Sequence, residues 1–126
     1  MKIVSQKTNT LICGHCCVAM ISGYPLSDVI DFIGHDRGTS TKELTRVLRK
    51  IGFSCSRRAK RIGKYSILPD LCILISRSAN NNKGNWHWIL YNKGKIYDSR
   101  CRKPHEYEKY IKRKKVRITS YIEIGE

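Results

Sequence analysis

Three side chains that together could perform thiol chemistry stand far apart in this sequence. Cys13 begins one apolar segment, His87 begins another, and Asp98 closes the segment after that. A reactive thiol needs a base to take its proton and an acid to orient that base, and the three groups must be close only in space. Their order therefore predicts a site with Cys13 as nucleophile, His87 as general base and Asp98 as the orienting acid.

The residues around Cys13 single it out among the six cysteines. Residues 13–22 have apolar side chains at helical spacing and are followed by Gly23, which can end a helix. Cys13 is thus expected at a helix N-terminus, where unpaired N–H groups and the helix dipole favour a thiolate. Cys72 lies inside an apolar run and is expected to be an inert core residue.

The order of the predicted elements indicates an α+β fold in a single domain covering residues 1–126. Ser27 is expected to cap a short helix, and Ser40 or Thr39 a third one in which Glu43 completes a capping box. Helices that precede antiparallel strands favour α+β over a parallel sheet. The expected helices are 13–22, 27–33, a third ending at Gly52, and 105–112; the expected strands are 53–56, 71–76, 86–91, 95–98 and 116–124.

Four motifs between about residues 6 and 98 resemble those of a known family. They are Gln6 followed by Cys13-Gly14; Arg37-Gly38-Thr39-Ser40 followed by Leu44, Leu48 and Gly52-Phe53; the strand 71–75 leading to His87-Trp88-Ile89-Leu90-Tyr91; and Lys95-Ile96-Tyr97-Asp98. In this order they resemble the bacteriocin-processing cysteine peptidases that cleave after double-glycine leaders, within the wider papain-like group. Where that family has an acidic residue before the cysteine, this chain has Ile12.

The resemblance implies a papain-like fold, with N-terminal helices packed on an antiparallel sheet. It also implies a cysteine peptidase that cleaves a peptide or isopeptide bond without a cofactor. The side-chain amide of Gln6 would face the developing oxyanion together with the backbone N–H of Cys13. Gly14, Trp86 and Trp88 flank the nucleophile and the base and are expected to contact the peptide or protein substrate.

A metal site is the rival interpretation of the cysteine-rich segment. Structural zinc prefers two paired ligand sets, and only one such pair, Cys13-Gly14-His15-Cys16, is present, so no metal is predicted. His15, His35 and His105 are expected on exposed turns or helix ends. The remaining thiols that could join a metal site are Cys17, Cys55, Cys72 and Cys101.

The chain is strongly basic, with 25 lysines and arginines against 10 acidic residues and a net charge of +15. Five positive charges lie in residues 57–64 and six in residues 109–117, with no acid in either block. Such blocks attract an acidic protein or a nucleic acid, or simply keep a small protein in solution. The alternative function is therefore a catalytically silent papain-like fold that binds an acidic protein, a nucleotide or nucleic acid through its basic surface.

The sequence favours a cytoplasmic protein. The first ten residues contain no apolar signal-peptide core, and no apolar run reaches the roughly 18 residues of a membrane span. The cysteines are then expected to be reduced. A small basic chain of this kind would suit a phage or mobile-element protein that acts in a bacterial host.

Overall fold

The computed structural model describes residues 1–63, 67–78 and 86–125, and within them it confirms the α+β class. The helices are α1 (Cys13–Ser22), α2 (Leu26–Ile33), α3 (Thr41–Ile51) and α4 (Tyr107–Lys114). The strands are β1 (Ser54–Cys55), β2 (Lys60–Arg61), β3 (Leu71–Ser78), β4 (His87–Asn92), β5 (Lys95–Tyr97), β6 (His105–Glu106) and β7 (Val116–Gly125).

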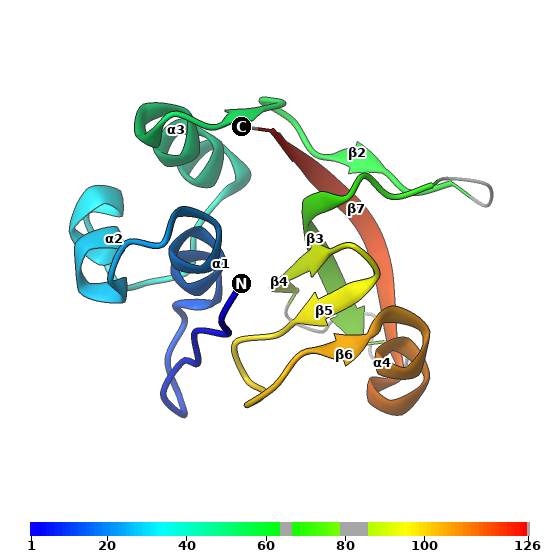
Figure 1. Ribbon diagram of the computed structural model, residues 1–126. Coiled ribbons are helices and arrows are strands. Elements are labelled where there is room, and N and C mark those ends of the chain that lie inside the picture. Colours follow the sequence, from blue (N-terminus) through cyan, green and yellow to red (C-terminus); the bar gives the residue numbers. More distant parts are fainter. Residues whose placement is uncertain (64–66, 79–85, 126) are drawn as a thin grey trace.

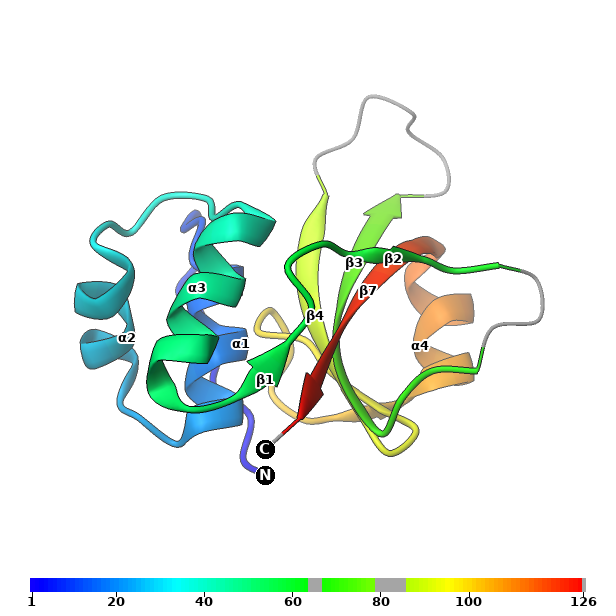
Figure 2. The ribbon, with the colours of Figure 1, turned by 90° about the horizontal axis from the view of Figure 1, so that it is seen from above.

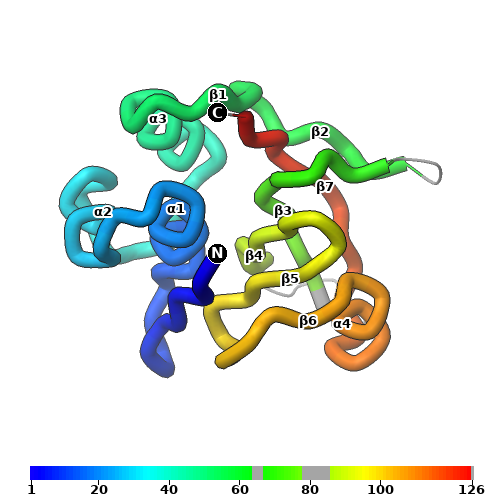
Figure 3. The backbone as a smooth tube through the Cα atoms, viewed as in Figure 1, coloured from blue at the N-terminus to red at the C-terminus, as the bar shows by residue number. Residues whose placement is uncertain are grey.

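The strands form one open antiparallel sheet in the order β1-β7-β3-β4-β5-β6, and β2 also pairs with β7 (Figure 1). Helices α1, α2 and α3 cover one side of the sheet and α4 lies on the other (Figure 2). Along the chain, three helices come first and the sheet is built after them (Figure 3). This arrangement separates an N-terminal helical half from the sheet, in which His87 begins β4 and Asp98 directly follows β5.

Two apolar cores hold these layers together. The larger core joins α1 and α3 to the sheet and includes Leu44, Leu48 and Trp88, which are fully or almost fully buried. The smaller core lies between the sheet and α4 and includes Ile89 and Tyr110. Side chains of β4 alternate between the two, with Trp88 and Leu90 in the larger and Ile89 in the smaller, as expected of a strand buried on both faces.

Gly14 lies where α1 closely approaches the segment before α3. A Cβ atom at this position would lie 2.2 Å from the Thr39 hydroxyl oxygen and 3.2 Å from Cδ1 of Trp88. The Trp88 indole N–H also donates to the Thr39 carbonyl oxygen at 3.1 Å. Glycine is required here because any side chain would push apart the elements that meet at the beginning of α1.

The ends of α2 and α3 follow different rules. Ser40 and Glu43 form the expected capping box of α3, and Gly52 ends that helix in a left-handed conformation. The prediction that Ser27 caps α2 is wrong, because the helix begins at Leu26 and is preceded by Pro25, without a side-chain cap. Proline is tolerated at this position because it has no N–H that would need a partner.

The structure corrects the expectation that His15 lies on an exposed turn. His15 is completely buried, and its Nε2 is 2.6 Å from the backbone oxygen of His35. The His35 ring in turn pairs with Glu43 at the start of α3. Helical spacing places position 15 on the inner face of α1, so this histidine connects the helices internally.

Strands β2 and β6 were not predicted from the sequence. Each is two residues long, and β2 lies inside the basic block 57–64, where no apolar alternation indicates a strand. Pairing with another strand accounts for these strands; β2, for example, pairs with β7 at Tyr121 and Ser120. Residues 60–61 of the first basic block therefore lie beside β7, the strand in which the second basic block ends.

No single helix in the described part of the chain is long and apolar enough to cross a membrane. Only α1 and α2 taken together would have the required length and composition, and a bend of 117° separates them.

Candidate active site

The helix that carries Cys13 begins without a side-chain cap. Ile12 occupies the N-cap position, where a serine or aspartate oxygen would usually accept a backbone N–H. The first turn of α1 contains no acidic residue either. Its unpaired N–H groups and the positive end of its dipole are therefore left to act on a negative charge at Cys13.

The sheet leaves room for this thiol beside β4. Strand β5 ends at Tyr97, which pairs with Leu90, so the first three residues of β4 have no β5 partner. Helix α1 packs against β4 with Gly14 beside the Trp88 ring, and the backbone N–H groups of Trp88 and Gly14 are near enough to the Cys13 sulfur to lower its pKa. The sulfur thus lies along the free edge of β4, next to His87.

The surroundings of Cys13 favour its charged form. Burial acts to raise the pKa of the thiol, but the His87 imidazole and the N–H groups of Trp88 and Gly14 together lower it below its ordinary value. A lower pKa means that more thiolate is present at a given pH, and the thiolate is the nucleophilic form.

His87 lies between the thiol and a carboxylate. Its Nε2 donates to Oδ1 of Asp98 at 2.7 Å, while its buried Nδ1 has no hydrogen-bond partner within the geometric limits among the described residues. Burial acts to lower the pKa of His87, but Asp98 and Cys13 raise it above its ordinary value. Nδ1 is thereby the atom left to exchange a proton with the sulfur.

Asp98 is fully engaged by donors. Oδ1 also accepts the backbone N–H of Arg100 at 2.9 Å, and Oδ2 accepts the Tyr110 hydroxyl at 2.7 Å. Burial acts to raise the pKa of Asp98, but His87 and these donors lower it to about 2. The carboxylate therefore stays ionised and fixes the orientation of the His87 ring near neutral pH.

Tyr110 was missed by sequence reasoning. It comes from α4, on the far side of the sheet from α1, and is almost fully buried. Its sequence neighbours indicate only a basic helix with an occasional aromatic residue, which is typical of a helix packed on a sheet. Tyr110 is a positioning residue, because it holds Asp98 and does not reach the thiol.

Gln6 lies close to Asp98 in the fold, but its side chain is committed elsewhere. Its backbone N–H donates to the Ser99 carbonyl oxygen at 2.8 Å, and its amide oxygen accepts the Ser99 hydroxyl. The amide nitrogen donates to the Thr10 backbone oxygen at 2.9 Å and approaches the Thr10 hydroxyl at 3.3 Å. In this conformation the side chain shapes the loop before Cys13 and offers no free donor.

The residues expected to contact substrate separate into two groups. Gly14 and Trp88 are buried in the contact between α1, Thr39 and β4, so their side-chain positions serve packing and are closed to a substrate. Their contact with a substrate stays a prediction, which this burial does not support. Trp86 is 41% exposed and stacks edge-on against Trp88, with ring centroids 4.8 Å apart. It alone of these three side chains is open to a ligand.

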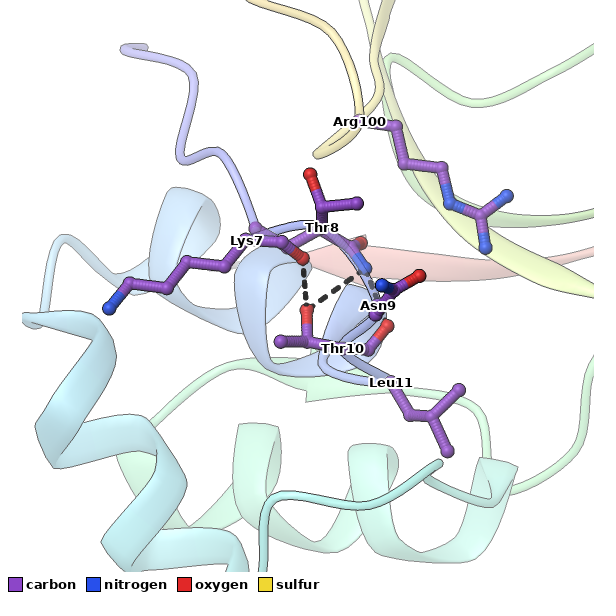
Figure 4. Close-up of a pocket in the computed structure, with 7 residues that line it drawn as sticks. Lys7, Thr8, Asn9, Thr10, Leu11 and Arg100 are labelled. Atoms are coloured by element: carbon purple, nitrogen blue, oxygen red, sulfur yellow. Dashed lines mark hydrogen bonds between the residues drawn. The ribbon is translucent and has the colours of Figure 1, made fainter.

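A loop with hollows on both sides precedes Cys13. One pocket of about 550 Å³ is lined by residues 6–11 and by Arg100, which approaches from the segment after β5 (Figure 4). A second, of about 650 Å³, lies between this loop and α2. The loop is tied internally, since the Thr10 hydroxyl donates to the Lys7 backbone oxygen at 2.6 Å.

The described residues contain no group of three or more histidine, cysteine or acidic side chains placed to hold a metal ion. Cys16 and Cys17 are buried in α1 and turned into the core. The cluster that suggested a metal site in the sequence thus contributes one thiol to the candidate site and two to packing.

We expect Cys13 to be the first thiol alkylated by iodoacetamide at about pH 6, because its pKa is lowered and a thiolate is the attacking species. Burial raises the pKa of Cys16 and Cys72 to about 12, and it also raises the pKa of Cys17, Cys55 and Cys101. Peptide mapping by mass spectrometry after short exposure measures the order of labelling.

Two histidine variants, one a test and the other its matched control, examine the cause of this labelling order. His87→Ala removes the group that lowers the pKa of Cys13 and should slow its labelling, whereas His105→Ala, in β6, should not. Similar labelling rates for Cys13 and Cys101 in the unmodified protein would contradict the prediction.

Neither a scan against protein-family models nor a search of the curated proteins finds a match to this chain. The resemblance to bacteriocin-processing peptidases therefore rests on the motifs quoted for it.

Proposed function

We propose that this protein is a papain-like thiol hydrolase that cleaves a peptide or isopeptide bond with Cys13, His87 and Asp98. The observation that supports the proposal most directly is the arrangement of His87, whose Nε2 is bound to Asp98 while its unpartnered Nδ1 is left for Cys13. The buried Nδ1 of His15 also has no partner among the described residues. What sets His87 apart is that its ring also pairs with Asp98 and lowers the pKa of Cys13.

In the proposed reaction the Cys13 thiolate attacks the carbonyl carbon, and a C–S bond forms while the carbonyl oxygen takes the negative charge. The tetrahedral intermediate collapses, the C–N bond breaks, and the His87 imidazolium gives its proton to the leaving amine. Water, deprotonated by the neutral imidazole, then attacks the thioester, which releases the acid and restores the thiol. Asp98 keeps the ring in the orientation that both proton transfers need.

The uncapped start of α1 would stabilise the oxyanion. The backbone N–H of Cys13 has no side-chain acceptor from the N-cap residue and belongs to the first turn of the helix. A preorganised donor of this kind contributes on the order of 3–4 kcal/mol to the stabilisation of a transition state. A second donor would be the Gln6 amide, after it turns away from Thr10.

Gln6→Ala tests whether the Gln6 amide rotates away from Thr10 toward the oxyanion. If the amide faces the oxyanion during catalysis, kcat falls by about 10²-fold while KM changes little. Thr10→Val is the control, since it removes the hydroxyl near Gln6 but leaves the backbone acceptor. A kcat that Gln6→Ala leaves unchanged would assign the oxyanion to backbone groups alone.

Turnover itself can be tested without a known substrate. The protein is incubated with a peptide library prepared from a bacterial proteome, and new termini are identified by mass spectrometry, with Cys13→Ala as the blank. Termini that appear only with the unmodified protein support hydrolysis. If none appear, and no thioester of Cys13 forms, the protein acts by binding and the proposal is wrong.

A further inference from the structure

A pocket of about 250 Å³ opens beside the His87–Asp98 pair, on the side where α4 packs. Arg77 of β3, Arg100 and Lys114 of α4 line it, together with His87, Asp98 and Tyr110. Residues with positive side chains from three separate segments therefore line one space beside the imidazole. We call it the basic pocket.

The positive charges of the basic pocket outnumber the negative charge in its lining. Asp98 is the acidic residue in its lining, and both of its oxygens are occupied by His87, Tyr110 and the Arg100 backbone. In the described part of the chain, the ion pairs of lysine and arginine are Lys60 with Glu123 and Lys109 with Glu106, away from this pocket.

Arg77 also lies directly opposite Arg117 in the pairing of β3 with β7. Like charges in this position destabilise a sheet. Arg117 is not part of the pocket lining, so the attraction of the pocket for an anion rests on Arg77, Arg100 and Lys114.

The position of the pocket relative to the reacting atoms indicates which half of a substrate it would hold. It is lined by His87 and not by Cys13. Because the imidazole must deliver its proton to the leaving amine, the departing half of the substrate lies on the imidazole side of the sulfur. A group in the basic pocket would then come from residues that follow the cleaved bond and reach past the imidazole to its Asp98 side.

We infer that the basic pocket binds a carboxylate in the leaving half of the substrate, so that the enzyme prefers an acidic residue shortly after the cleaved bond. This inference rests on the proposed function. A volume of about 250 Å³ suits one or two acidic side chains and is too small for a nucleic-acid duplex. The carboxylate could belong to a side chain or to a free C-terminus, and both present the same group to arginine.

The peptide library tests this preference directly. We expect aspartate and glutamate to be enriched at the first positions after the cleaved bond, and then test synthetic peptides with glutamate, glutamine or an amidated C-terminus. A preference for glutamate that persists in amidated peptides indicates the side chain, whereas loss upon amidation indicates the C-terminus.

The double variant Arg77→Gln/Lys114→Gln removes two charges of the basic pocket. We expect it to lower kcat/KM for the acidic peptide by about tenfold, as the loss of two partly exposed ion pairs would, and to leave the glutamine peptide unchanged. Lys112→Gln/Arg113→Gln removes two charges from the same helix outside the pocket lining and is the matched control. Equal effects of both variants, or no preference for acid, would overturn the inference and leave the hydrolase proposal intact.

A substrate-independent measurement separates failure of the inference from failure of the proposed function. Iodoacetate and iodoacetamide differ by one carboxylate, so the ratio of their rate constants at Cys13 reports the local attraction of anions. We expect this ratio to fall by about threefold in Arg77→Gln/Lys114→Gln and to be preserved in the control. If no peptide is cleaved, an unchanged ratio overturns the inference as well, and a lowered ratio retains the pocket as a carboxylate site.

Discussion

Cys13→Ala is expected to abolish turnover, with a loss of at least about 10⁴-fold in kcat, because no other group can form the thioester. His87→Ala should cause a loss of similar size, since the thiol then has neither a base nor a proton donor for the leaving amine. Single-turnover and steady-state rates on any peptide cleaved by the unmodified protein measure both effects.

The two variants should not simply add. Nucleophile and base act as one unit, so Cys13→Ala combined with His87→Ala should be no slower than either alone. Cys17→Ala serves as a control, because Cys17 is a buried core thiol in the same helix and its pKa is raised by burial. An activity that survives Cys13→Ala at its full level would show that the thiol is not the nucleophile.

Trp88→Ala is expected to destabilise the protein by about 3–5 kcal/mol, which is the usual consequence of removing a large aromatic side chain from a core. Trp88 is 1% exposed, and its indole N–H holds the Thr39 carbonyl oxygen. The change should therefore loosen the contact between α1 and the segment before α3. Urea unfolding followed by circular dichroism measures the shift.

Trp86→Ala is the matched control for this loss of stability. Trp86 contacts the same indole edge-on but is 41% exposed, so its removal should reduce the free energy of unfolding by about 1 kcal/mol. Comparable losses of unfolding free energy in the two variants would mean that the packing of Trp88 does not stabilise the protein as proposed.

The parts of the fold that depend on local patterns could be predicted from the sequence. The bounds of α1 and the capping box of α3 agree with the structure, and Lys93-Gly94 forms the turn between β4 and β5 with positive φ at both residues. These features are encoded within a few neighbouring residues. In contrast, β2 and β6 form because the edges of β7 and β5 offer them partners, which their own residues do not indicate.

The residues of the candidate site also divide into those that local sequence patterns indicate and those that depend on the fold. Cys13, His87 and Asp98 stand at the ends of apolar segments, and the structure brings the latter two into direct hydrogen bonding. Tyr110 could not be found because its contact with Asp98 depends on how α4 crosses the sheet. The commitment of Gln6 to Thr10 depends on the conformation of a loop, and helical or strand periodicity carries no information about it.

The isoleucine before the nucleophile ties the start of α1 to the core. Ile12 occupies the N-cap position without a side-chain oxygen, and it is 7% exposed and belongs to the larger core. An aspartate or serine in its place would lose this packing and bury a polar side chain, so it should destabilise the protein rather than cap the helix. Apolar packing at residue 12 thereby fixes where the helix begins, and polar substitutions there should loosen the placement of Cys13 before they alter its chemistry.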